Sequence, residues 1–135
     1  MRKTGAEGAE IFKKLYRTEG LKSIRKREEW IKLLQKAQSV NQQNTVTTSK
    51  ITLDIMHKIA TSSLRKYTKS VLLELLAYYK TPMIVTTMLE MSHIFGRSRY
   101  RIAEALQEAT RIGVSIYTSR FGTVLDFTKI EGGDS

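Results

Sequence analysis

Apolar side chains recur every three or four residues along most of the chain, a spacing that places them on one face of an α-helix. The pattern predicts amphipathic helices over 11–16 and 21–37, either as two helices or as one helix broken at a glycine. Further helices are predicted over 51–59 and 64–79, and the second of these stops before the only proline. The N-terminal half is therefore expected to be largely helical.

Two shorter helices are predicted further along, each with its own start and stop signals. Thr87 precedes Glu90 by three residues, which is a capping-box pattern for a helix that ends at Gly96. Ser98 can cap the next helix, whose apolar positions continue until Gly113. The two helices are thus separated by a turn of a few residues.

After Gly113 the spacing of apolar residues changes from helix-like to strand-like. Residues 114–118 and 123–128 are rich in residues that favour strands, and the turn-like segment 119–122 separates them. This arrangement predicts a β-hairpin.

An uncharged polar stretch interrupts the helical pattern in the middle of the chain. Its Ser, Thr, Asn and Gln side chains compete with helical hydrogen bonds, so we expect a linker over 39–50. The predicted organisation is a basic amphipathic helical extension over 1–38 that could form a dimer, this linker, a domain over 51–130 and a flexible tail over 131–135.

Charge and composition restrict the possible partners. The chain carries 23 Lys and Arg against 13 Asp and Glu, a formal net charge of +10. Such a protein attracts polyanions, of which nucleic acid is the commonest, while a membrane surface or an acidic protein is the alternative. Absence of cysteine excludes disulfides and thiolate nucleophiles. No apolar run approaches the roughly 18 residues that a membrane-spanning helix needs.

Three residues in the C-terminal half carry a resemblance to a known family. Ser92, Gly96 and Ile102 stand at the spacing that lets two crossing helices pack closely around a tight turn. Together with the order helix, helix, helix, hairpin, the segment 64–130 resembles the winged helix-turn-helix DNA-binding family, although serine stands at 92 where alanine is usual. The resemblance implies a fold that is mainly α with a small β-hairpin wing (α+β), preceded here by an N-terminal helical extension.

The resemblance also implies that the helix beginning at Ser98 enters the major groove, with the hairpin on an adjacent groove or on phosphates. Arginine can bind guanine or phosphate through paired hydrogen bonds, and Glu104 could accept one from cytosine. The basic cluster near residue 25 either adds phosphate contacts or only keeps its helix soluble. The candidate DNA-binding residues are Arg97, Ser98, Arg99, Tyr100, Arg101, Glu104, Thr118, Arg120, Lys22, Arg25 and Lys26.

Residues typical of catalysis are scarce. The two histidines, His57 and His93, lie on separate predicted helices, and no glycine-rich phosphate loop or glycine-flanked nucleophilic serine is present. We therefore expect no enzymatic activity, no metal site and no cofactor.

The expected partner is double-stranded DNA. The protein is expected to be a transcriptional regulator or a DNA-organising or segregation protein, located in the cytoplasm and associated with the nucleoid. We expect a homodimer, because the apolar stripe that includes Trp30 must be covered, by a second copy or by the chain folding back. The alternative function is a winged-helix protein-interaction module in a replication, segregation or transcription assembly. RNA binding is a third possibility with few stacking side chains behind it.

Overall fold

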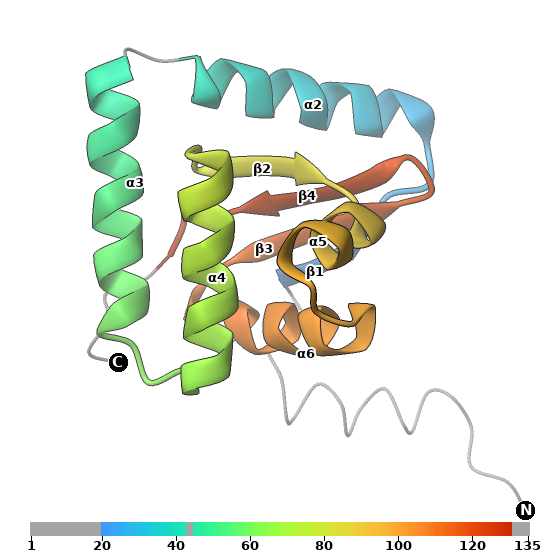
Figure 1. The fold of residues 1–135 in the computed structure, drawn as a ribbon. Helices are drawn as coiled ribbons and strands as arrows, with labels where there is room; N and C mark the ends of the chain where they lie inside the picture. Colours follow the sequence, from blue (N-terminus) through green and yellow to red (C-terminus); the bar gives the residue numbers. More distant parts are fainter. Residues whose placement is uncertain (1–19, 43–44, 131–135) are drawn as a thin grey trace, which may run out of the picture.

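A computed structural model describes residues 20–42 and 45–130 of the chain (Figure 1). The helix predicted over 11–16 and the tail predicted over 131–135 lie outside these residues. No helix of the described ranges is long and apolar enough to cross a membrane.

Four helices pack together on one side of a small sheet. They are α3 (Thr45–Ala60), α4 (Lys66–Tyr79), α5 (Met88–Phe95) and α6 (Arg99–Ala109), and a 3-10 turn (Thr110–Ile112) follows the last of them. Their apolar stripes meet in one buried core with the inner face of the sheet, centred on Leu72, Leu75, Met91 and Ile102. Each apolar stripe is removed from water only where it packs against a neighbouring element. Burial of these side chains therefore holds the helices together.

The sheet has four strands in the order β1-β3-β4-β2. They are β1 (Leu21–Ser23), β2 (Met83–Thr86), β3 (Ser115–Ser119) and β4 (Gly122–Asp126). Strands β3 and β4 form an antiparallel hairpin, β2 adds to β4 in antiparallel orientation, and β1 adds to the other side of the hairpin in parallel orientation. The N-terminal part of the chain is thus built into the same sheet as the C-terminal hairpin.

Helix α2 (Arg27–Asn41) covers the opposite face of the sheet, away from the four other helices (Figure 1). Its buried residues Trp30, Leu33 and Ala37 pack against Met83 and Val124. The Asn41 side-chain amide closes this contact at its far end, because it donates to the Met83 carbonyl at 2.7 Å and accepts from the Met83 amide at 3.2 Å. The sheet is therefore enclosed between two helical layers.

The order α4, β2, α5, α6, β3, β4 confirms the predicted fold class, mainly α with a small β-hairpin wing. Both predicted helix starts are confirmed as well. The Thr87 hydroxyl accepts from the Glu90 amide at 3.0 Å, and the Ser98 hydroxyl accepts from the Arg101 amide at 3.2 Å. Between them Gly96 adopts a left-handed φ of 63°, which is costly for residues with a Cβ.

Two predictions about the N-terminal half are wrong, and the argument for a third is removed. Residues 21–23 form strand β1 rather than the start of a helix, because Leu21 pairs with Ile116 and packs at the edge of the main core. The linker predicted over 39–50 is mostly helical, since α2 continues to Asn41 and α3 begins at Thr45. The apolar stripe around Trp30 is buried against the chain's own sheet, which removes the reason for expecting a homodimer through it.

Candidate nucleic-acid interface

Helix α6 is fixed to α4 through a buried carboxylate. Glu108 is 4% exposed, and its two oxygens bind the Arg65 guanidinium at 3.1 Å and the Arg111 guanidinium at 3.2 Å. The Thr68 hydroxyl donates to the same carboxylate. A buried carboxylate needs such partners, because an unpaired charge inside a protein is strongly unfavourable. Together with the buried apolar side chains of Ile102 and Leu106, these contacts fix which side chains of α6 face outward.

The turn before α6 is held from both sides. The Ser92 hydroxyl donates to the Arg97 carbonyl at 2.6 Å, so the serine that replaces the usual alanine stabilises the turn. The Arg97 guanidinium binds Glu74 at 2.8 Å and lies 4.9 Å from the centre of the Tyr67 ring. The hydrogen bonds that Arg97 donates to the Glu74 carboxylate raise the pKa of Arg97 above its ordinary value. Arg97, a candidate DNA contact by sequence, is thus engaged within the protein.

A second polar contact joins the preceding elements. The Tyr79 hydroxyl at the end of α4 donates to the Glu90 carboxylate at 2.6 Å and lies 2.7 Å from the Thr86 hydroxyl. Desolvation and the hydrogen bond to Glu90 raise the pKa of Tyr79 from 10.0 to about 12. The contact connects α4, β2 and α5.

The raised pKa gives a testable pH dependence. Because the folded protein holds the phenol proton more tightly than the unfolded chain, the stabilisation is present below pH 10 and is lost as the pH rises towards about 12. We expect a late component in the ultraviolet titration of tyrosinate, to which Tyr117 with its raised pKa also contributes, and Tyr79→Phe should reduce this component by one tyrosine. The matched control, Tyr78→Phe, should retain this component, and a titration unchanged by Tyr79→Phe would contradict the assignment.

The outward face of α6 carries a mixture of polar and aromatic side chains. Tyr100 is 75% exposed and Arg99 beside it is also exposed. Arg101 turns towards α4, because its guanidinium lies 4.9 Å from the Tyr67 ring centre and 3.9 Å from Glu104. Gln107, which sequence reasoning missed, lies on the same helical stripe as Tyr100 because it is seven residues later. The seven-residue spacing from Tyr100 was the sequence signal that could have identified Gln107.

A groove of about 280 Å³ separates α6 from the sheet. Ala103 and Gln107 line it from the helix, while Leu21, Thr118 and Thr123 line it from three strands. The outward part of α6 and the edge of the hairpin therefore border one surface.

Hydrogen bonds and ring stacking hold the hairpin tip. The Ser119 hydroxyl accepts from the backbone amides of Phe121 and Gly122 at 3.0 and 3.2 Å, which closes the turn. The Phe121 ring stacks on Trp30 of α2 with 6.3 Å between ring centres, and the exposed Arg120 guanidinium lies 5.1 Å from the Phe121 ring centre. The tip is thus supported by α2 while Arg120 remains accessible.

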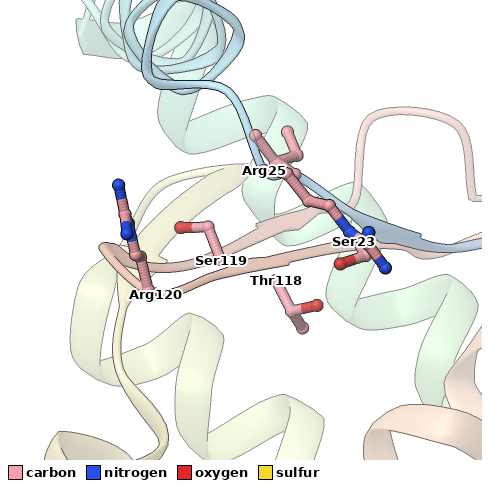
Figure 2. Close-up of a pocket in the computed structure, with 6 residues that line it drawn as sticks. Ser23, Arg25, Thr118, Ser119 and Arg120 are labelled. Carbon is pink, nitrogen blue, oxygen red and sulfur yellow. The ribbon is translucent and has the colours of Figure 1, made fainter.

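Strand β1 brings the N-terminal basic residues to this tip. Ser23 pairs with Thr118, and the Ile24 amide donates to the Thr118 carbonyl at 2.7 Å. The following Arg25 therefore lies beside the hairpin, across a depression of about 440 Å³ from Arg120 (Figure 2). The two groups of basic residues, which the sequence placed nearly 100 positions apart, border one depression.

The other two basic candidates take different positions. Lys22 pairs with Tyr117 and its ammonium lies 5.7 Å from that ring centre, so it is on the α2 side of the sheet, opposite to Ser23. Lys26 is exposed and directly precedes the first turn of α2.

The arginines divide into two groups by their charge partners. Four of them lie within 4.0 Å of a carboxylate, namely Arg65, Arg97, Arg101 and Arg111. Over residues 20–42 and 45–130, Arg25, Arg27, Arg99 and Arg120 form no ion pair. The nearest acidic positions along the chain to Arg25 are Glu28 and Glu29, in the first turn of α2, where a helix N-terminus favours negative charge. Arg25, Arg120 and Arg99 lie around the hairpin and at the start of α6, while Arg27 lies at the start of α2.

The described part of the chain contains no group of three or more histidine and acidic residues that could hold a metal ion. His57 and His93 are both exposed, on α3 and α5.

Comparison of the chain with protein-family models, with curated proteins and with solved structures finds no match.

Proposed function

We propose that this protein binds double-stranded DNA, with α6 in the major groove and the hairpin and the end of β1 on the phosphate backbone. The observation that carries the proposal is the distribution of unpaired arginines. Arg25, Arg99 and Arg120 are exposed and lack carboxylate partners among the described residues, whereas the arginines that hold the helices together have them. Polyanion binding by such residues releases counterions from DNA.

The α6 surface supplies groups suited to base edges. An amide such as that of Gln107 can bind adenine through two hydrogen bonds, and Arg99 can bind guanine or a phosphate. Tyr100 can contact phosphate or pack against a thymine methyl group. The Ser98 side chain caps α6, and it therefore contributes to DNA binding by presenting the helix N-terminus to a phosphate.

Binding to DNA is tested by fluorescence anisotropy with a labelled duplex enriched from a random pool. We expect the affinity to fall steeply between about 50 and 200 mM salt. The double variant Arg25→Ala/Arg120→Ala should bind more weakly and reduce the slope of log affinity against log salt by about two. Lys36→Ala is the matched control, because Lys36 is an exposed cation on α2. Absence of duplex binding by the wild type at about 50 mM salt would refute the proposal.

The number of protein copies on the DNA can be determined from the duplexes that are enriched from the random pool. The apolar stripe that suggested a homodimer is buried, so a second copy bound through α2 is not part of the proposal. Two enriched half-sites about one helical turn apart would show two copies on the DNA, and a single short site would show one. Duplex binding would place the protein with the nucleoid in the cytoplasm, as part of a regulator or of a DNA-organising protein.

A protein-interaction module is the second candidate. Leu53 and Leu89 are 66% and 67% exposed on α3 and α5, and such side chains are common at protein interfaces. This candidate is favoured if the duplex affinity is weak and Leu89→Asp, rather than Arg99→Ala, abolishes the function in cells.

A further inference from the structure

We infer that the depression between the end of β1 and the hairpin tip seats the sugar-phosphate backbone of one DNA strand, with Arg25 and Arg120 on two different phosphates of that strand. The inference rests on the proposed function and adds to it how the backbone is bound. It also assigns a role to a segment, 23–25, that lies outside the helix-turn-helix unit.

The depression has the size and lining for such a ligand. Its volume of about 440 Å³ falls in the range of about 300–1,000 Å³ typical of small-molecule sites, so there is room for a sugar with its neighbouring phosphates. Figure 2 shows Arg25 and Arg120 at opposite sides of it, with Ser119 and Thr118 between them. The separation of the two guanidinium groups favours two phosphates over one.

The chemistry of the lining matches an anion. A guanidinium binds a phosphate through two parallel hydrogen bonds, and serine and threonine hydroxyls such as those of Ser23 and Thr118 commonly donate to phosphate oxygens. No carboxylate lines the depression. An acidic side chain there would repel the DNA backbone, so its absence is consistent with the inferred ligand.

The backbone at both arginines is tied to the hairpin. Arg120 belongs to the turn that Ser119 closes and that Phe121 anchors on Trp30. Arg25 directly follows the Ile24 amide, which is bonded to the Thr118 carbonyl. Since both are tied to the same end of β3, they should contact phosphates at a constant separation along one strand.

The test is a scan in which single phosphates of the selected duplex are replaced by neutral methylphosphonates. We expect the wild type to lose affinity by roughly three- to ten-fold at a position contacted by Arg25 and at another contacted by Arg120 on the same strand. Arg25→Ala should abolish the sensitivity at the first position only, and Arg120→Ala at the second only. Lys36→Ala should retain both, and circular dichroism should show that every variant is folded.

Two results would overturn the inference while the proposed function stands. One is duplex binding in which both variants retain the wild-type pattern of sensitive phosphates. The other is a pattern in which the two arginines couple to phosphates on different strands. Failure of the wild type to bind any duplex would instead refute the proposed function itself, and the inference with it.

Discussion

Trp30→Ala is expected to lower the free energy of unfolding by about 3–5 kcal/mol, the usual cost of removing a large buried aromatic side chain. Trp30 is 7% exposed and packs with Leu33, Met83 and Val124 between α2 and the sheet. Its ring also approaches the hairpin closely, since a Cβ at Gly122 would lie 3.3 Å from the indole. The substitution therefore removes both the core contact and the support of the hairpin tip.

Chemical denaturation followed by circular dichroism measures this effect, because the variant lacks the only tryptophan of the chain. The control is Ile31→Ala, the neighbouring position on α2, which is 42% exposed and should cost about 1 kcal/mol or less. Equal losses for the two variants would mean that α2 does not pack on the sheet through Trp30.

Arg99→Ala is expected to weaken duplex binding by about 1–3 kcal/mol, up to roughly 150-fold, with little change in stability. Arg99 is exposed in the first turn of α6 and forms no ion pair with the described residues. Arg97→Ala should have the opposite profile. Arg97 binds Glu74 and packs on Tyr67, so its loss should cost about 1–2 kcal/mol of stability and affect DNA binding mainly through the turn.

The two variants form a matched pair, since each removes one arginine and they differ by two positions in sequence. Anisotropy titrations and thermal unfolding on the same samples separate the profiles. If Arg97→Ala weakens binding more than Arg99→Ala at equal stability, the turn rather than α6 is the DNA contact.

The segment from α5 through the turn at Gly96 to α6 was predictable because its signals are local. The Thr87 and Ser98 caps and the Gly96 turn each depend on residues within a few positions, and the structure has all three. Strands β1 and β2 were not predicted, since each is short and becomes a strand only by pairing with residues far along the chain. Leu21 pairs with Ile116, and Met83 pairs with Asp126.

The candidate site likewise has features that local sequence predicts and features that depend on contacts between distant residues. The exposure of Arg99 and Tyr100 follows from the helical spacing of the apolar residues around Ile102, which can be read from the local sequence. The engagement of Arg97 depends on Glu74, which is 23 residues earlier on another helix. Likewise, only the parallel pairing of β1 with β3 brings Arg25 near Arg120.

The support of the hairpin by α2 has a consequence for how a duplex would fit. A wing on a mobile loop can adjust to each target, but here the tip is closed by Ser119 and stacked on Trp30. The duplex would then be the component that bends or changes its groove width. Base steps that deform at low energetic cost would be preferred even where no side chain reaches them.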